Sequence, residues 1–430
     1  MSRILEWIFD GVRIHFQGAK LHALFFRPID DKEKLATKAF FLQLVIKDFV
    51  KSVFNKAFPA YDNFEVAGGA DIGNAIGTKN GSWNDRELLF LGACANYAAK
   101  IISTSGRLRL TKSLYGALPQ TLKNCCDEIE VEGGDNVYQI KALKQSDLDD
   151  LLKTYKIEWD REKSRERIDE DKKNHPLKDI AYSSANTRID LDSLSIWNNK
   201  RVLGASIFGD VAGFAGYIDS AKTDDEKKKA LKVLHIIRKE MATVLKCDFN
   251  GLRIQFQGDR VQGLFHLPKD EEQDIAAEVV RAAVGLQSSM EKTVKTAMPD
   301  AKDLQLAVGI DLDTTLVSNL GARAHRDRIC LGEPVENAAA TEERCSGGQI
   351  GISERIYKAL PEELSKHFAY DTKAKCYVAN GLTQDKLDWA SSASKAPSFI
   401  STGSSGIRIS DRESEGARPI VPARSYAGED

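Results

Sequence analysis

The chain has 430 residues, with 61 Lys and Arg against 63 Asp and Glu, and its formal net charge is −2. This balance excludes the overall basic field that draws proteins to nucleic acid, and no apolar run approaches the roughly 20 residues of a membrane-spanning helix. The seven cysteines are scattered without a CxxC pair, and no secretory signal opens the sequence. These features predict a reduced, cytoplasmic protein with neither a disulfide framework nor a zinc site.

A domain-sized repeat dominates the sequence. The segment Asp10–Lys20 returns as Asn250–Arg260, and the register holds without a gap as far as Gly92 and Gly332, before a slip of two residues. Two copies at this spacing indicate a duplicated domain, because solenoid repeats are much shorter and more numerous. The chain is long enough to bury two separate cores.

The predicted elements follow the same order in both copies. In the first copy the pattern predicts a hairpin over 12–26, a long helix over 34–58, a strand over 64–71 and a helix over 93–102. In the second copy it predicts a strand over 304–311 and a helix over 336–344. Strands mixed with helices that cross back over them predict an α/β (α+β) fold class, with one mixed or antiparallel sheet and packed helices in each copy.

Composition divides the chain into an N-terminal half (1–142), a charged linker (143–199), a C-terminal half (200–390) and a tail (391–430). The linker mixes both signs of charge and is poor in apolar residues, which is typical of a solvated helix rather than a binding patch. The tail is rich in Ser, Gly, Pro and Arg, so it is predicted to be disordered or to order only on assembly.

The second copy begins with a segment that has no counterpart in the first copy. Residues 202–214 form an apolar strand pattern that contains Asp210, and a helix-like run follows over 227–244. The repeat offset would place the equivalent strand of the first copy before Met1. Either the N-terminal half lacks its first strand, or the chain starts later than in its relatives; the sequence leaves both possibilities open.

The two copies differ in complementary polar residues. The second copy has Asp259 where the first has Ala19, whereas the first has Asn96 and Lys100 where the second has Glu336 and Ala340. Homologous halves with such complementary losses predict one composite site at the interface of an intramolecular pseudo-dimer; association of whole chains into a homo-oligomer stays open.

Four motifs resemble those of class III nucleotidyl cyclases. Residues 206–214 resemble the first-strand motif with its acid, and Gly258-Asp259 resembles the hairpin with the second acid. The segment from Gly92 to Lys100 resembles the helix with Asn and a basic residue, and residues 319–323 resemble the triphosphate-binding Gly-x-Arg element. Each motif is weak alone, but four in the right order are much stronger. The sequence around the hairpin and around 200–208 is most similar to that of the pyrimidine cyclases of bacterial Pycsar anti-phage signalling.

The resemblance implies a reaction in which the ribose 3′-oxygen attacks the α-phosphorus of a nucleoside triphosphate and pyrophosphate leaves. It assigns roles to six residues: metal ligands Asp210, Asp259 and the carbonyl of Val211, ribose-orienting Asn96, transition-state cation Lys100, and triphosphate-binding Arg323. The chemistry of these residue types agrees, because two divalent ions, Mg²⁺ or Mn²⁺, prefer oxygen ligands and developing phosphoryl charge needs a cation. A separate effector that senses the cyclic nucleotide is the implied partner.

The base pocket departs from the purine cyclases. Where those enzymes read the purine edge with charged or polar groups, this chain has His15 and Leu89. Leu89 offers no hydrogen bond, which favours a pyrimidine, UTP or CTP, with UTP preferred. Glu132 stands where purine cyclases often have a lysine, and an acid there weakens the prediction of efficient catalysis.

Other interpretations compete with each assignment. Asp259 could be an ordinary turn residue, and Asp210 could cap the helix that follows it. Asn96 and Lys100 could be ordinary surface residues of a helix. His15 and Leu89 could be core residues of a degenerate pocket. Arg326 or Arg328 could replace Arg323, while Asp71 and Asp311, present in both copies, suggest a structural role. The rival functions are a purine cyclase with an unusual pocket and a catalytically dead pseudocyclase that senses nucleotide.

Overall fold

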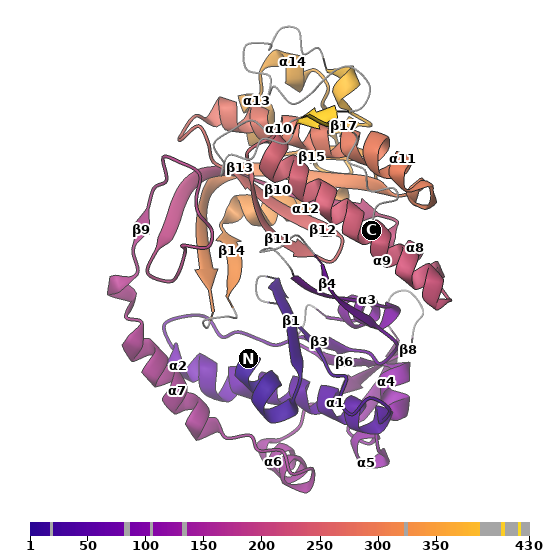
Figure 1. The fold of residues 1–430 in the computed structure, drawn as a ribbon. Coiled ribbons are helices and arrows are strands. Elements are labelled where there is room, and N and C mark those ends of the chain that lie inside the picture. Colours follow the sequence, from indigo (N-terminus) through magenta and orange to yellow (C-terminus); the bar gives the residue numbers. More distant parts are fainter. Residues whose placement is uncertain are drawn as a thin grey trace. The chain divides into compact units, whose positions relative to one another are not determined.

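The structure is a computed structural model that describes residues 1–17, 20–80, 87–103, 106–130, 136–321, 326–387, 406–408 and 420–422. The chain divides into two compact units (Figure 1). Unit 1 comprises residues 1–79 and 88–179, and unit 2 comprises 80–87 and 180–430. The α/β fold class predicted from the sequence is confirmed, since each unit combines strands with packed helices.

Unit 2 is built on a nine-stranded sheet. Its main order is β11-β12-β10-β13-β15-β17-β16, with β14 paired to β13 and β9 paired to β10. The strands are β9 (Tyr182–Ser183), β10 (Asn199–Ala212), β11 (Leu252–Gln257), β12 (Arg260–Phe265), β13 (Gln305–Leu320), β14 (Asp327–Leu331), β15 (Gln349–Ile352), β16 (Ala369–Asp371) and β17 (Cys376–Asn380). The long central strand β10 is therefore held on both sides, by β12 and by β13.

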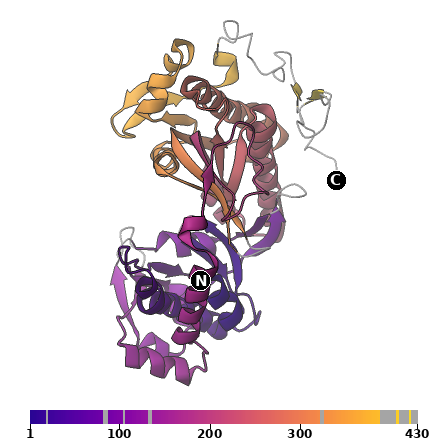
Figure 2. The same cartoon turned by 90° about the vertical axis from the view of Figure 1, so that its left-hand side faces the viewer.

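Helices cover both faces of this sheet (Figure 2). A Cβ at Gly209 of β10 would contact Leu286 of α10, whereas a Cβ at Gly309, paired with Phe208, would strike the backbone of α12 at Glu342. Because neighbouring residues of a strand face opposite ways, α10 and α12 lie on opposite faces. The helices are α8 (Phe214–Ser220), α9 (Asp224–Thr243), α10 (Glu272–Ser289), α11 (Lys295–Ala297), α12 (Glu333–Arg344), α13 (Glu354–Ala359) and α14 (Glu362–Ser365).

Short helical turns and one hairpin complete unit 2. They are η4 (Val244–Asp248), η5 (Met290–Val294), η6 (Pro299–Ala301), η7 (Gln384–Lys386), and the paired strands β18 (Gly406–Arg408) and β19 (Ile420–Pro422). The rest of the predicted tail lies outside the described residues.

Unit 1 has a related sheet that lacks a counterpart of β10 among its described residues. Its four-stranded sheet has the order β3-β6-β8-β7, and two hairpins, β1-β2 and β4-β5, form separate sheets. The strands are β1 (Val12–Gln17), β2 (Lys20–Leu24), β3 (Gly68–Ala70), β4 (Ile76–Asn80), β5 (Glu87–Leu91), β6 (Leu108–Thr111), β7 (Cys126–Glu130) and β8 (Asn136–Ile140). In unit 2 the strand β10 joins the hairpin β11-β12 to β13, so without such a strand the hairpin β1-β2 stays apart.

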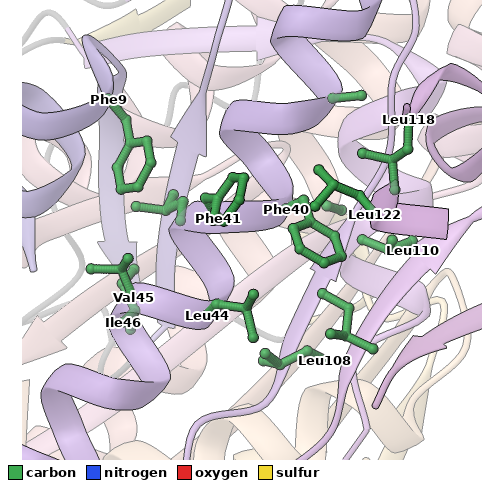
Figure 3. Close-up of a cluster of buried hydrophobic side chains, with 14 of the residues drawn as sticks. Phe9, Phe40, Phe41, Leu44, Val45, Ile46, Leu108, Leu110, Leu118 and Leu122 are labelled. Carbon is green, nitrogen blue, oxygen red and sulfur yellow. The ribbon is translucent and has the colours of Figure 1, made fainter. Parts of the chain in front are cut away.

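The core of unit 1 forms under α1 (Lys32–Asp48) (Figure 3). This helix starts at Asp31, whose side chain accepts a hydrogen bond from the Lys34 N–H at 3.0 Å, satisfying one of the first free donors of the helix. Phe40 and Phe41 are fully buried in the same cluster as Leu110 of β6. Burial of each such side chain stabilises the fold by about 1.5–3 kcal/mol.

Unit 1 has further helices and short helical turns among its described residues. They are α2 (Asn55–Ala57), α3 (Ala93–Lys100), α4 (Lys112–Ala117), α5 (Gln120–Lys123), α6 (Gln145–Thr154) and α7 (Arg161–Asn174), with the turns η1 (Ile4–Ile8), η2 (Phe49–Phe54) and η3 (Leu177–Asp179). No described helix of the chain is both long enough and apolar enough to cross a membrane.

The segment predicted as a linker belongs partly to each unit. Its first part forms α6 and α7, and α7 is strongly charged with Ser164 as its buried residue. Its last part carries Ala185, Ile189 and Leu194, which are buried in a core cluster of unit 2. Apolar residues in this charged segment thus pack into the core of unit 1 near its start and into a core cluster of unit 2 near its end.

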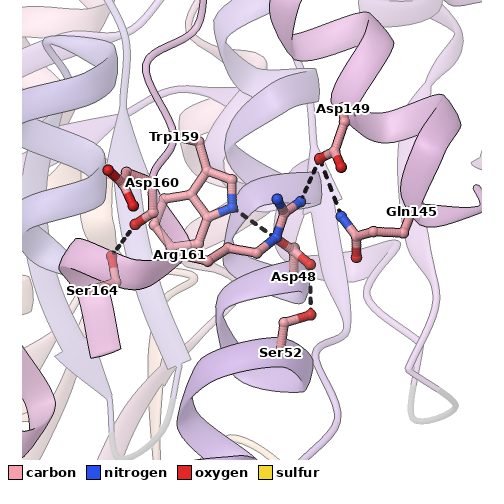
Figure 4. Close-up of polar contacts among 8 residues, drawn as sticks. All are labelled: Asp48, Ser52, Gln145, Asp149, Trp159, Asp160, Arg161 and Ser164. Carbon is pink, nitrogen blue, oxygen red and sulfur yellow. Dashed lines mark hydrogen bonds and ion pairs between the residues drawn. The ribbon is translucent and has the colours of Figure 1, made fainter. Parts of the chain in front are cut away.

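A buried carboxylate fixes α7 to unit 1 (Figure 4). Asp48, at the end of α1, accepts hydrogen bonds from Trp159 Nε1 at 2.7 Å, Arg161 Nε at 2.6 Å and Ser52 Oγ at 2.8 Å. Arg161 also pairs with Asp149 of α6 at 2.7 Å. Because the buried charge has these partners, the helices α1, α6 and α7 are held in one arrangement.

Candidate active site

The sheet of unit 2 brings Asp210 and Asp259 to the same corner. Asp210 lies near the end of β10, and Asp259 lies in the turn between β11 and β12. The antiparallel register pairs Gly209 with Val261, so the next position sets Asp210 opposite Arg260, the neighbour of Asp259. Gly258 precedes Asp259 with φ +72°, a left-handed conformation that favours glycine and lets the hairpin turn tightly.

The two carboxyl groups lie in an environment that disfavours their negative charge. Burial, together with the nearby charge of Asp210, raises the pKa of Asp259 to about 8. Burial also raises the pKa of Asp210, against the opposing effects of Arg260 and of the Val211 N–H. Half-buried acids that crowd together with too little positive charge are typical of a site that binds a cation.

Arg260 and Glu342 are two further charged residues at this corner that the sequence did not single out. Arg260 Nη2 lies 2.6 Å from the carboxylate of Glu342 and donates to the carbonyl of Ala339 at 3.1 Å. The guanidinium also lies 4.5 Å from the ring centroid of Phe208. The available signal was a difference between the repeats, since the residue that corresponds to Arg260 in the first copy is Lys20.

The donor set at this corner suits a hard divalent ion. No three His, Cys, Asp or Glu side chains of the described ranges form a complete metal site. Two carboxylates, from Asp210 and Asp259, and the carbonyl of Val211 supply oxygen donors only. Mg²⁺ typically binds to one or two carboxylates and takes further ligands from substrate phosphates, so these residues fit such an ion.

Asn96 and Lys100 lie one turn apart on α3 of unit 1. Spaced by four residues, they share one side of the helix. Asn96 is half-buried, whereas Lys100 is exposed, with its Nζ 5.5 Å from the ring centroid of Tyr97. The helix lies directly on β3, because a Cβ at Gly69 would come within 2.0 Å of the Ala98 carbonyl oxygen.

The predicted base-pocket residues belong to separate two-stranded sheets of unit 1. His15 lies on β1, half-buried, with its ring centroid 5.2 Å from that of His22 in an edge-on contact. Leu89 lies on β5 and is 4% exposed. The first position thus offers a polar ring and the second an apolar wall.

Other residues singled out in the sequence have varied surroundings. Arg323 and Glu132 lie outside the described residues. Arg328, an alternative triphosphate ligand, donates from Nη2 to Asp192 at 2.6 Å, so its guanidinium already has a carboxylate partner. Asp71 follows the end of β3 and accepts a hydrogen bond from Thr111. Asp311 was also predicted to end a strand, but it lies within β13, which continues to Leu320, and it accepts a hydrogen bond from Asn337 at 2.9 Å.

Comparison with known proteins gives the class. Residues 204–388 match the family model of the adenylate and guanylate cyclase catalytic domain. A solved structure from Pseudomonas aeruginosa, described as a class III adenylyl cyclase-like ATP-binding protein, superposes with a TM-score of 0.73 at 24% identity, over 89% of this chain and 80% of that one. That likeness establishes the fold. Residues 204–388 are therefore similar to the catalytic domain of adenylate and guanylate cyclases.

Two relatives match almost the whole chain. The uridylate cyclase of Pseudomonas aeruginosa is 28% identical over 436 residues, which is 96% of this chain and 80% of the relative. The uridylate cyclase of a Rhizobium species is 26% identical over 401 residues, or 88% and 74% of the two chains. The resemblance to pyrimidine cyclases drawn from the motifs is thereby confirmed.

Proposed function

We propose that the protein is a uridylate cyclase, which converts UTP, with CTP as the other pyrimidine candidate, into the 3′,5′-cyclic nucleotide and pyrophosphate. The observation that carries this proposal is the pairing of Asp210 with Asp259 in unit 2. The first copy has Ala19 in place of Asp259, yet it alone has Asn96 and Lys100. A single composite site that uses both units explains why neither copy has kept the full set.

In this proposal the chain positions and neutralises the reacting groups. The Asn96 amide orients the ribose, so that its 3′-oxygen bonds to the α-phosphorus as the bond to the pyrophosphate oxygen breaks. The Lys100 ammonium faces the negative charge that develops on the α-phosphoryl oxygens, and loss of such a contact typically costs about a hundredfold or more in rate. Arg323 would bind the triphosphate by charge-assisted hydrogen bonds.

Asp210, Asp259 and the Val211 carbonyl would hold two divalent ions, Mg²⁺ or Mn²⁺. When bound, such ions lower the pKa of the attacking hydroxyl and offset the charge of the phosphates. The raised pKa of both acids supports this assignment, because nearby positive charge is what would favour their ionised forms.

The choice of a pyrimidine rests on His15 and Leu89 and on the names of the two full-length relatives. A neutral imidazole offers one donor and one acceptor, and Leu89 offers only an apolar surface. A purine edge would leave polar groups unmatched there, at a cost of about 1–3 kcal/mol for each buried group.

The product implies a partner. A cyclic pyrimidine nucleotide acts only through a receptor, so we propose a separate effector that senses it and harms the infected cell, as in the anti-phage systems that the sequence resembles.

The test is incubation of the purified full-length chain with each of the four nucleoside triphosphates and Mn²⁺, with products identified by mass spectrometry and kcat/KM compared. Cyclic UMP as the main product supports the proposal. A preference for ATP or GTP would refute the pyrimidine assignment but leave the cyclase standing. Nucleotide binding without any cyclic product would favour the pseudocyclase.

A further inference from the structure

Arg260 lies at the corner of unit 2 that also carries Asp210 and Asp259. It lies opposite Asp210 across the pair of β10 and β12, near enough to lower the pKa of that carboxyl. Its ion pairs within the described residues are with Glu342 at 2.6 Å and Glu343 at 3.6 Å, both on α12. Its side chain is 17% exposed, whereas that of Glu342 is 6% exposed. Glu342 therefore anchors a cation beside the acid pair while part of the cation faces solvent.

The first copy supplies an internal comparison for this pair. In unit 2 a Cβ at Gly309 would lie 2.2 Å from the Glu342 nitrogen, so glycine lets α12 rest on β13 at that point. In unit 1 a Cβ at Gly69 would lie 3.0 Å from the Ile102 side chain at the end of α3. The same helix contact is thus present in both units, with Ile102 in the place of Glu342. Helix packing alone does not need the acid.

The residue opposite Glu342 changes with it. Arg260 corresponds to Lys20, which is exposed on β2. The pair of Arg260 and Glu342 therefore occurs in the copy that has Asp210 and Asp259, and is absent from the copy without Asp259. The pair thus accompanies the acids, in the unit that also has β10.

The pair is also an imperfect structural contact. The Nε of Arg260 is buried without a hydrogen-bond acceptor among the described residues. Nη1 reaches the exposed carboxylate of Glu343 only at 3.6 Å, which is too long for a good hydrogen bond. A buried Nε–H without an acceptor costs free energy, so the contact with α12 leaves part of the guanidinium unsatisfied.

We propose that Arg260 is a phosphate-binding residue of the cyclase site, and that Glu342 is the positioning residue that holds it there. This proposal rests on the proposed function. It adds Arg260, on the same hairpin as Asp259, as a second phosphate-binding cation beside Arg323. The Nη2 edge stays bound to Glu342 and Ala339, while the Nη1 edge exchanges Glu343 for an oxygen of the triphosphate or of the pyrophosphate product. Arginine suits this position because its planar guanidinium can bind a carboxylate on one edge and a phosphate on another in fixed geometry, whereas lysine offers a single point charge.

The test measures binding to the full-length chain by isothermal titration calorimetry, with Mn²⁺ alone and with Mn²⁺ plus inorganic pyrophosphate. Arg260→Lys keeps the charge and the contact with Glu342 but loses the fork. We expect it to weaken pyrophosphate binding about tenfold, the size of one hydrogen bond to a charged group, and to change Mn²⁺ affinity less than about twofold. Glu342→Gln should also weaken pyrophosphate binding, because Arg260 loses its charged anchor.

Glu343→Gln is the matched control, since Glu343 is exposed and holds Arg260 weakly; its effect on pyrophosphate binding should stay within about twofold. In turnover assays Arg260→Lys should raise KM for all triphosphates alike and leave the order of base preference unchanged. Unaltered pyrophosphate affinity in Arg260→Lys would overturn the assignment of Arg260 alone. A wild-type chain that binds no pyrophosphate with Mn²⁺ would overturn the proposed metal site as well.

Discussion

Asp210 lies on the strand beside the hairpin that carries Asp259. Burial is the largest cause that raises the pKa of Asp259 to about 8, and the charge of Asp210 is the second. The two acids are 49 positions apart in the sequence, and the pairing of β10 with β12 brings them together. Because the two acids interact, their protons are lost as a coupled pair rather than independently.

The first prediction is that Asp210→Ala and Asp259→Ala each lower cyclase turnover by more than about a hundredfold. In the proposed site either change removes a direct metal ligand, and even indirect partners of metal sites are worth about ten- to hundredfold. Circular dichroism should show an unchanged fold. Near-normal turnover in either variant would show that the metal assignment is wrong.

The pH dependence of stability gives a second prediction. An acid whose pKa rises on folding, here from the ordinary 3.8 to about 8 for Asp259, is protonated in the folded chain where the unfolded chain is ionised. The folded state therefore loses stability as pH rises through this window. Without metal, Asp259→Asn should melt at least about 2 °C above wild type near pH 8 and close to it near pH 4.

Metal provides the control for this experiment. Mn²⁺ should raise the melting temperature of wild type near pH 8 and have little effect near pH 4, since ligand carboxylates must be ionised to bind. Asp259→Asn should respond weakly at both values. If wild type without metal gains stability relative to Asp259→Asn as pH rises, the sign of this argument is wrong.

The third prediction concerns α3. Asn96→Ala and Lys100→Ala should lower kcat about a hundredfold and affect nucleotide binding less, because their contacts strengthen as charge develops. The corresponding changes in the second copy, Glu336→Ala and Ala340→Ser, should be nearly silent. Strong inactivation by Glu336→Ala would instead reveal a role for the pseudo-symmetric position, such as a regulatory pocket.

Local pattern predicted the elements well where one segment decides its own structure. The hairpin predicted over 12–26 is present as β1 and β2, and the helix over 336–344 is present as α12, which starts earlier, at Glu333. The strand predicted over 64–71 is only Gly68–Ala70 in the structure. Strand length depends on neighbours, and unit 1 has no described counterpart of β10 to extend it.

The ion pairs that complete the candidate site could not be predicted in this way. Arg260 and Glu342 are 82 positions apart, and each stands in a segment whose pattern explains it without the other. Their contact depends on the close approach of α12 to the sheet, which Gly309 permits because a Cβ there would lie 2.2 Å from the Glu342 nitrogen. Comparison of the two copies was the sequence signal that could have found the pair.

The fourth prediction tests the anchor of the charged segment. Asp48→Ala removes the shared acceptor of Trp159 and Arg161, and the loss of these buried hydrogen bonds should cost about 1–3 kcal/mol, since Arg161 keeps its pair with Asp149. Because two units need not unfold together, hydrogen exchange resolved along the chain is the suitable measurement. Exchange should speed up in α7 and leave β10 unchanged. Glu162→Ala, an exposed change in the same helix, should have little effect.

The last prediction concerns the base. Replacing His15 with Lys and Leu89 with Asp restores the kinds of polar group with which purine cyclases read adenine. Leu89 is 4% exposed on β5, so a carboxylate there must find a partner or destabilise the fold. Adenine offers such a partner in its amino group, whereas uracil has a single N3–H donor between two carbonyl oxygens that would repel the carboxylate.

The double variant should therefore raise the ratio of kcat/KM for ATP to that for UTP by at least about tenfold. This is about the effect of one hydrogen bond gained with adenine and one unfavourable contact introduced with uracil. The His15→Lys single variant is the control, since it adds charge but no acceptor for the amino group. It should move the ratio much less than the double variant. An unchanged ratio in a folded, active double variant would mean that the base binds elsewhere, and that His15 and Leu89 belong to the core of unit 1.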